Sequence, residues 1–375
     1  MATVAWGYVC ERCGHREEQT TRDWRCPACG GAFAMEGIPG ISASGINQSD
    51  PTLWRYAGAL PVAQGETRSL GAGMTPLVAG TLSGRTVYFK LDGALPTGSF
   101  KDRGAAVLVA HLRSLGLNRV IVDSSGNAAA AMSGFCAANG LRCTVYAPAT
   151  TSRGKLVQSR AFGAEVMLVD GSRDDVATAA QRAAENDPSA FYASHNWHPV
   201  FVEGVKTWAL EVWEQLGNCL PSAVFVPTGG GSAFVGARRG FDAVGGALPV
   251  LIAAQPAACS PIVAACENGA SDIKPVTPGT TMAEGTRIGA PSRGRQIMAA
   301  IHDSTGWAEG VSEEQIVAAL RELWAQGLYV EPTAAIGAAA CIATIEREQL
   351  PDGDVVVLLT GNGLKATETI ATLLV

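Results

Sequence analysis

The sequence is poor in charged and in aromatic side chains. Of its 375 residues, 17% are charged and 6% aromatic, and 34 Asp and Glu against 28 Lys and Arg give a net charge of −6. Because this balance offers nucleic acid or an anionic membrane no electrostatic attraction, we expect neither as a partner. No apolar run is long enough to span a bilayer, and the start lacks the basic flank and cleavage site of a secretion signal. We therefore expect a cytoplasmic protein.

Glycine and small apolar residues are abundant instead. The chain has 44 glycines and is 47% hydrophobic, which is typical of an α/β enzyme and not of a disordered or fibrous chain. At this length it can form two domains with large cores. Six of the ten cysteines are scattered in mostly apolar surroundings, as expected for reduced core thiols: Cys136, Cys143, Cys219, Cys259, Cys266 and Cys341.

The other four cysteines form two Cys-x-x-Cys pairs, Cys10 with Cys13 and Cys26 with Cys29, and a glycine follows each pair. Such a knuckle turns tightly and points both thiolates at one ion, and two knuckles supply the four sulfur ligands that zinc prefers. A closed four-thiolate shell leaves no position for catalysis, so we expect a structural Zn²⁺ in a ribbon over residues 1–38. A pair of empty or oxidised knuckles is the open alternative.

Short apolar runs alternate with segments of helical period from residue 86 onward. This alternation predicts parallel sheets covered by helices on both faces. Helices are expected at 53–60, in a linker region, and at 103–115, 127–139, 153–162, 172–186 and 203–216. Strands are expected at 87–91, 119–122, 143–147, 165–169, 190–193, 223–226, 250–254 and 355–359.

One lysine has an unusual position. Residues 96–103 read Pro-Thr-Gly-Ser-Phe-Lys-Asp-Arg, which places Lys101 in the first turn of an apolar helix, with Ser99 as the expected N-cap. A lysine amine held in a pocket can lose its proton near neutral pH and form a Schiff base with a carbonyl compound. A structural lysine at a helix start is the alternative.

Two loops between a strand and a helix could hold anions. The turn Ser124-Ser125-Gly126-Asn127 offers free N–H groups to a carboxylate, although an ordinary capped helix start would look similar. In the second loop, Thr228 and Ser232 flank three glycines, so the backbone can approach an anion closely. This second loop lacks the Gly-Lys-Ser/Thr ending of a nucleotide-binding P-loop.

The Ser-Phe-Lys-Asp-Arg run resembles the cofactor-lysine motif of fold-type II pyridoxal-phosphate (PLP) enzymes, and within them of the threonine synthase family. A Gly-x-Gly-x-Thr-Pro-Leu run from Gly71, which opens the catalytic region in that family, precedes it. The two loops and a Thr-Gly-Asn-Gly run from Thr360 follow it in the family's order. The resemblance implies two parallel-sheet α/β/α domains of the tryptophan synthase β type behind the ribbon. The smaller would span about 85–210 and the larger about 39–84 plus 211–375, in a homodimer.

The resemblance also implies roles for individual residues. Lys101 would hold the cofactor and later remove the Cα proton of an amino-acid substrate. The cofactor would contact Phe100, Asn127, Thr228, Gly229, Gly230, Gly231, Ser232, Glu284 and Thr360. The substrate would contact Ser124, Ser125, Gly126, Asn127 and His198. Candidates for holding a substrate phosphate are Arg160, His198, Lys206 and Arg293.

The implied activity is conversion of O-phospho-L-homoserine and water to L-threonine and phosphate, by γ-elimination and addition of water at Cβ. Three residues differ from the usual family pattern close to where the substrate is read: Ala128, His198 and Asn362. The alternative is therefore β-elimination or β-replacement on serine, O-phosphoserine or threonine, as in relatives of the cysteate synthase or ammonia-lyase type. A zinc-ribbon regulatory protein with an inactive enzyme domain is a third class, and the intact Lys101 motif argues against it.

Overall fold

The computed structural model describes residues 6–374, and the chain divides into two compact units. Unit 1 contains Ile46–Gly73, Lys101–Val205 and the described residues up to Pro39. Unit 2 contains Gly40–Gly45, Met74–Phe100 and the described residues from Lys206 onward. Within residues 6–374, no helix is both long and apolar enough to cross a membrane.

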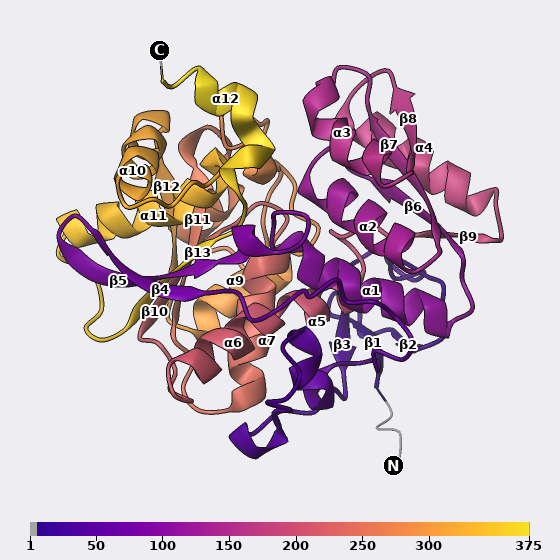
Figure 1. Cartoon of the computed structure of the whole chain (residues 1–375), viewed down its shortest axis with the longest axis horizontal. Helices are drawn as coiled ribbons and strands as arrows, with labels where there is room; N and C mark the ends of the chain where they lie inside the picture. Colours follow the sequence, from indigo (N-terminus) through magenta and orange to yellow (C-terminus); the bar gives the residue numbers. More distant parts are fainter. Residues whose placement is uncertain (1–5, 375) are drawn as a thin grey trace. The chain divides into compact units, whose positions relative to one another are not determined.

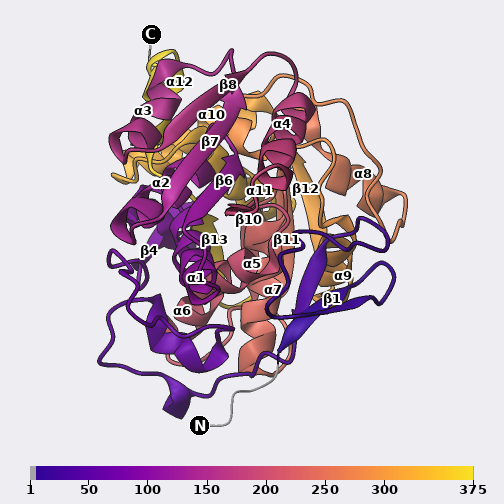
Figure 2. The same cartoon turned by 90° about the vertical axis from the view of Figure 1, so that its right-hand side faces the viewer.

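Unit 1 is built on a four-stranded parallel sheet in the order β8-β7-β6-β9, with α2 and α4 on opposite faces (Figure 2). A small antiparallel sheet, β2-β1-β3, carries the cysteine knuckles. Its elements are β1 (Gly7–Cys10), β2 (Arg16–Glu18), β3 (Phe33–Glu36), the 3-10 helix η2 (Leu53–Ala59), α1 (Lys101–Ser114), β6 (Arg119–Asp123), α2 (Asn127–Ala138), β7 (Arg142–Pro148), α3 (Arg153–Ala161), β8 (Glu165–Val169), α4 (Arg173–Glu185), β9 (Ala190–Tyr192) and α5 (Pro199–Val205).

Two glycines allow α1 and α5 of unit 1 to pack closely. A Cβ on Gly104 would lie 2.5 Å from the ring of Phe201, and a Cβ on Gly204 would overlap the carbonyl oxygen of Arg103. Residues 102–112 of α1 are all buried, so this helix is covered on every side. Because this close packing holds α1 rigidly, the backbone of Lys101, its first residue, has a fixed position.

Unit 2 is built on a six-stranded sheet in the order β12-β11-β10-β13-β5-β4, parallel except for the β4–β5 hairpin (Figure 1). Its elements are η1 (Ala43–Gly45), β4 (Leu77–Leu82), β5 (Arg85–Leu91), η3 (Asp92–Ala94), α6 (Thr207–Gln215), β10 (Ala223–Pro227), α7 (Ser232–Val244), β11 (Val250–Pro256), η4 (Ala257–Cys259), α8 (Pro261–Glu267), η5 (Glu284–Thr286), α9 (Gly294–Asp303), β12 (Trp307–Val311), α10 (Glu313–Ala325), α11 (Pro332–Glu346), β13 (Val355–Leu359), η6 (Gly363–Ala366) and α12 (Thr367–Ala371).

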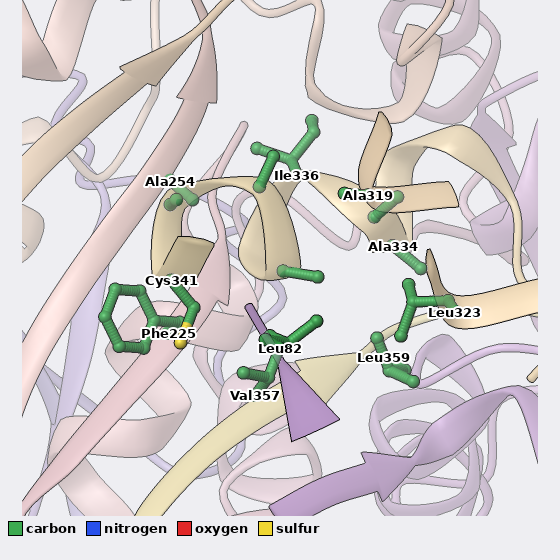
Figure 3. Close-up of a cluster of buried hydrophobic side chains, with 14 of the residues drawn as sticks. Leu82, Phe225, Ala254, Ala319, Leu323, Ala334, Ile336, Cys341, Val357 and Leu359 are labelled. Carbon is green, nitrogen blue, oxygen red and sulfur yellow. The ribbon is translucent and has the colours of Figure 1, made fainter. Parts of the chain in front are cut away.

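The core of unit 2 lies between this sheet and α10 and α11. Figure 3 shows Phe225 and Val357 of the central strands facing Ile336 and Cys341 of α11. The central strands β10 and β13 are buried at every position, so they read as continuous apolar runs instead of alternating ones.

A buried polar network ties the start of unit 2 to α6. The Nζ of Lys90 donates to Glu211 Oε2 at 2.7 Å and to Gln215 Oε1 at 2.8 Å, and neither charged side chain of the pair is exposed to solvent. Glu211 also accepts the N–H groups of Met74, at 2.8 Å, and Thr75, at 3.1 Å. These contacts fix the Gly-x-Gly-x-Thr-Pro-Leu turn, in which Met74 has a positive φ of 45°.

The expected strands are all present, and several boundaries differ from the expectation. The strand expected at 87–91 is β5, which pairs with β13 and β4 in the sheet of unit 2, whereas it was placed in the smaller domain. The helix expected at 203–216 is two helices, α5 and α6, which meet at Lys206 where the chain passes into unit 2.

Ser99 does not cap α1, contrary to the expectation. The helix begins at Lys101, so Ser99 lies two residues before it, and its Oγ is buried without a hydrogen-bond partner. The strand β12 was missed, since Trp-Ala-Glu-Gly-Val has no strong apolar alternation.

Candidate active site

In unit 1, Lys101 lies over an aromatic ring. Its Nζ is 5.7 Å from the ring centroid of Phe201 on α5, and the side chain is partly buried. The close packing of α1 on α5 sets this contact. A cation over the face of an aromatic ring is attracted by the electrons of the ring, so this contact positions the Lys101 amine.

His195 lies beside the same ring and was not predicted. Its ring centroid is 5.9 Å from that of Phe201, and the side chain is buried. Burial lowers the pKa of His195 well below its usual value, and the positive charges of Lys101 and Arg173 lower it further. A neutral imidazole therefore faces the Lys101 region at neutral pH. The sequence signal for His195 is its place at the start of the segment His-Asn-Trp-His.

The loop Ser124–Asn127 joins β6 to α2 in unit 1. The N–H of Gly126 donates to Ser124 Oγ at 3.3 Å, and no side chain caps α2. A Cβ on Gly126 would meet no atom within 4 Å, so the space in front of this helix N-terminus is open. An uncapped N-terminus with open space could accept a carboxylate, and the role of this loop in substrate binding stays a prediction.

In unit 2, the glycine loop joins β10 to α7. Gly231 has a φ of +93°, a conformation that side chains disfavour, and a Cβ there would lie 2.6 Å from Ile297. A Cβ on Gly229 would lie 2.8 Å from the backbone of Thr286. No side chain caps α7, so its first N–H groups are suited to a phosphate.

Thr360 of unit 2 is a buried hydroxyl that lacks a partner. It directly follows β13, its backbone oxygen accepts the Phe100 N–H at 2.9 Å, and its Oγ1 makes no hydrogen bond. An unpaired buried hydroxyl fits the role of binding a ring nitrogen of a cofactor. Glu284, by contrast, is an exposed residue at the start of η5.

His198 lies in an aromatic cluster of unit 1. Its ring packs against Tyr8 of β1, His111 of α1 and Phe191 of β9, with centroid separations of 6.1, 5.7 and 5.4 Å. It is 2% exposed, so the ring serves packing between the knuckle sheet and α1. Asn362 likewise has local partners, because its side chain accepts the Leu364 N–H and donates to the Gly93 oxygen.

The four ribbon cysteines converge. Their sulfur atoms all lie within 4.8 Å of one another, with 3.4 Å between Cys10 and Cys29 and 3.6 Å between Cys13 and Cys26. A tetrahedron of sulfurs at zinc bonding distance has edges of about 3.8 Å. The Gly31 N–H and the neighbouring thiols lower the pKa of Cys29 to about 7, whereas burial raises the pKa of Cys10. The set fits a zinc ion.

Over residues 68–361, the chain matches the family described as pyridoxal-phosphate dependent enzyme. The chain belongs to this family. The expectation of a fold-type II PLP enzyme is confirmed, and the free hydroxyl of Thr360 and the uncapped glycine loop fit the cofactor.

Relatives of this PLP-dependent enzyme include two proteins named threonine synthase. The one from Methanocaldococcus jannaschii is 33% identical over 95% of this chain and 92% of its own length. The one from Methanosarcina acetivorans is 31% identical over 96% of this chain and 92% of its own length.

Among solved structures, a threonine deaminase from T.th. aligns with a TM-score of 0.68 and 27% identity, over 79% of this chain and 93% of its own. An L-serine ammonia-lyase from Rhizomucor miehei aligns with a TM-score of 0.70 and 21% identity, over 80% and 96%. The second likeness concerns the fold alone.

Proposed function

We propose that this PLP-dependent enzyme is a lyase of the threonine synthase type, which converts O-phospho-L-homoserine and water to L-threonine and phosphate. The relatives named threonine synthase, similar over nearly the whole chain, support the substrate. The observation that carries the proposal is the position of Lys101 over Phe201, at the start of a helix whose residues 102–112 are all buried.

In this proposal the cofactor is held by Lys101, Phe100 and Asn127, by the glycine loop from Thr228 to Ser232, and by Glu284 and Thr360. Pyridoxal phosphate supplies an electron-accepting ring that stabilises negative charge at the substrate Cα. Because Thr360 is a neutral hydroxyl, it would bind the ring nitrogen without holding a proton there as a carboxylate does.

The protein's own residues bind the substrate and move its proton. The Ser124–Asn127 loop and the α2 N-terminus hold the α-carboxylate through N–H groups. The amine of Lys101 takes the proton from Cα. His195 also lies beside the Phe201 ring, but its pKa is well below the usual value, so it accepts a proton poorly. The proton is therefore assigned to the Lys101 amine.

The test is an assay of phosphate and threonine release from O-phospho-L-homoserine by the PLP-loaded enzyme. We expect equal amounts of both products, and a loss of at least about 1,000-fold in Lys101→Ala. Lys274→Ala, at an exposed lysine of unit 2, is the matched control and should keep full activity. Cofactor binding without phosphate release would contradict this substrate.

The second candidate is β-elimination from an unphosphorylated hydroxy amino acid such as serine or threonine. One observation favours it: Asp123, which precedes the carboxylate loop, has a buried oxygen without a partner. A carboxylate at that place repels a phosphate ester. Release of ammonia and a 2-oxo acid from serine or threonine would establish this candidate.

We also propose that the ribbon cysteines Cys10, Cys13, Cys26 and Cys29 bind one structural Zn²⁺ and that the enzyme is a homodimer. The convergence of the four sulfurs supports the metal site. Metal analysis should give one zinc per chain and none after Cys10→Ser with Cys26→Ser. Light scattering should give twice the mass of one chain, and the mass of one chain would contradict the dimer.

A further inference from the structure

The cysteine ribbon of unit 1 reaches α1 through Tyr8. The Tyr8 hydroxyl lies 3.1 Å from Nε2 of His111 on α1, and the Tyr8 ring packs against His198, with ring centroids 6.1 Å apart. The rings of His111 and His198 also contact each other, at 5.7 Å. Tyr8 is 1% exposed and lies in β1, two residues before Cys10. The ribbon strand that leads into the first knuckle is therefore hydrogen-bonded to the helix that begins with Lys101.

A second aromatic residue, Trp24, lies between the two cysteine knuckles and contacts the end of β9 and the segment that follows it. Its ring packs edge-on against Tyr192, with ring centroids 4.9 Å apart, and edge-on against Trp197, at 5.3 Å. Tyr8 and Trp24, which we call the two ribbon anchors, thus contact α1 and residues 192–198.

Both of these segments lead to the Lys101 side chain. Lys101 is the first residue of α1, and its Nζ lies 5.7 Å from the ring centroid of Phe201. Phe201 lies on α5, which begins directly after residues 192–198, and its ring also contacts His195 of that segment, at 5.9 Å. The contacts therefore run from the ribbon to both partners of the Lys101–Phe201 contact, and all of them lie within unit 1.

The loop that carries Trp24 depends on the cysteines for its shape. Residues 19–32 contain no helix or strand, and the three ribbon strands are only three or four residues long. So small a unit cannot bury a core of its own and usually needs a metal or disulfides to fold. A Cβ on Gly31 would lie 3.1 Å from the Cys10 sulfur, so the loop closes tightly around the sulfur atoms. Because metal binding and folding are coupled in such sites, we expect loss of the metal to release this loop together with Trp24.

We propose that Tyr8 and Trp24 are positioning residues for the Lys101 amine, and that a zinc ion bound by the ribbon cysteines maintains this position through Trp24. The inference rests on the proposed function, in which Lys101 holds the cofactor, and on the proposed zinc site. A ribbon that only stabilised the fold would change how many molecules are active, whereas a positioning ribbon changes the rate at each active site.

The position of the amine matters because it must reach both the cofactor and the substrate proton. A displacement of about 1 Å in a reacting group can lower a rate by about 100-fold. Loss of the Trp24 contacts frees the segment that precedes α5, so we expect the Phe201 ring, and with it the Lys101 amine, to lose its fixed position. Loss of the Tyr8 hydroxyl removes one hydrogen bond to α1 but keeps the packing of the ring, so its effect should be smaller.

The experiment follows the attachment of PLP to Lys101 in the full-length protein. Samples are reduced with borohydride at a series of times, and the labelled Lys101 peptide is quantified by mass spectrometry. In Trp24→Ala we expect attachment to be about 10-fold slower than in the wild type. With O-phospho-L-homoserine, kcat per labelled site should fall by about 10- to 100-fold, while KM changes by less than about threefold. Tyr8→Phe should lower kcat per labelled site by about threefold to tenfold. Trp24→Phe, which keeps an aromatic ring, should restore most of the rate.

Zinc removal tests the link to the metal. In the wild type, treatment with a chelator should slow PLP attachment about as much as Trp24→Ala does, and added Zn²⁺ should restore it. In Trp24→Ala, the chelator should have less than about a twofold further effect, because both changes remove the same contact. Arg16→Ala is the matched control, since Arg16 pairs with Glu36 on the ribbon surface, where the side chains are 67% and 40% exposed. It should leave both rates unchanged.

A chelator-treated wild type that attaches PLP to Lys101 at the normal rate would overturn the proposal, and so would a wild type that contains no zinc. Fewer labelled sites in Trp24→Ala with an unchanged kcat per site would also overturn it, because the ribbon would then only stabilise the fold. Tyr8→Phe carries the test if Trp24→Ala does not give a folded protein by circular dichroism. Failure of the proposed function has a separate signature, which is normal labelling of Lys101 without phosphate release from O-phospho-L-homoserine. The rate of PLP attachment still reports the effect of the ribbon in that case.

Discussion

Two regions of the molecule treat buried polar groups in opposite ways. In unit 2, Lys90 and Glu211 are fully buried, and the Glu211 carboxylate accepts hydrogen bonds from Lys90 and from the N–H groups of Met74 and Thr75. At the carboxyl ends of β6 and β13, by contrast, the buried atoms Asp123 Oδ1 and Thr360 Oγ1 make no hydrogen bond. The Lys90 and Glu211 groups cost little to bury because they hydrogen-bond within the protein, whereas the unpartnered oxygens remain costly until a ligand binds to them.

This difference separates buried polar groups that stabilise the fold from buried polar groups that can bind a ligand. Lys90 and Glu211 join β5 to α6 and hold the turn before β4, and a ligand would find no unmet bonding capacity there. Asp123 lies at the carboxyl end of a parallel strand, the position where open α/β sheets bind ligands. Thr360 follows β13 in the same way, and its hydroxyl is also unpartnered. Satisfaction of hydrogen bonds is thus a better guide to function than burial.

The largest loss of stability should come from disrupting the hydrogen-bonded network of Lys90 and Glu211. Lys90→Met leaves Glu211 as a buried charge without its cation, so the free energy of unfolding should fall by about 3–5 kcal/mol. Urea denaturation measures it. Arg295→Met is the control, because Arg295 and Asp272 are about half exposed (51% and 49%) at 3.1 Å and such pairs contribute about 0–1 kcal/mol. Equal losses in both variants would refute the distinction.

His111 is an intermediate case in unit 1, because its Nε2 lies 3.1 Å from the Tyr8 hydroxyl while its Nδ1 has no partner. Burial lowers the pKa of His111 to about 4. The unfolded chain takes up this proton near pH 6.5, so the free energy of unfolding should fall between about pH 6.5 and 4, by about 3 kcal/mol in total. Above pH 6.5 this group has no effect.

Denaturation at a series of pH values, with His111→Gln as the comparison, measures the slope. The variant should lose less stability than the wild type as the pH falls from 6.5 to 4. Parallel curves for the two proteins would show that His111 does not take up a proton on unfolding in this range.

Gly231→Ala tests whether the glycine loop binds the cofactor phosphate. A side chain at a φ of +93° costs about 1–2 kcal/mol and would press on Ile297, so cofactor affinity should fall by about 10-fold. Gly245→Ala is the control, because it introduces similar strain at a φ of +77° with open space around it. Fluorescence titration with pyridoxal phosphate measures both. Equal affinities would place the cofactor phosphate elsewhere.

The smallest loss of stability should come from removing an unpartnered hydroxyl. Thr360→Val deletes no hydrogen bond and removes a buried polar atom that is costly while it is unsatisfied, so the free energy of unfolding of the apoenzyme should not fall and should rise by up to about 1–3 kcal/mol. Thr360→Val should still shift the absorbance of the bound cofactor. A loss of stability as large as that of Lys90→Met would show that this hydroxyl serves the fold.

Local sequence was enough for the motifs and most of the fold. The glycine loop, the Ser124–Asn127 turn and the Lys101 helix each lie at a strand–helix junction whose residues are contiguous, so spacing alone placed them. The buried strands β10 and β13 were equally clear, because strands covered on both faces are continuously apolar.

The remaining features depend on contacts between distant segments. The position of β5 next to β13 is a matter of sheet order, which no local pattern encodes. His198 matches a substrate-reading segment by sequence, but its ring packs against Tyr8 and His111.

The most direct test of the account is chemical mapping of the cofactor lysine. The enzyme is incubated with pyridoxal phosphate, reduced with borohydride to fix the cofactor on its lysine, digested, and examined by mass spectrometry. The account predicts one cofactor mass per chain, on the peptide that contains Lys101 and on no other. A label on a different lysine, such as Lys206 or Lys365, or no label at all, would contradict it.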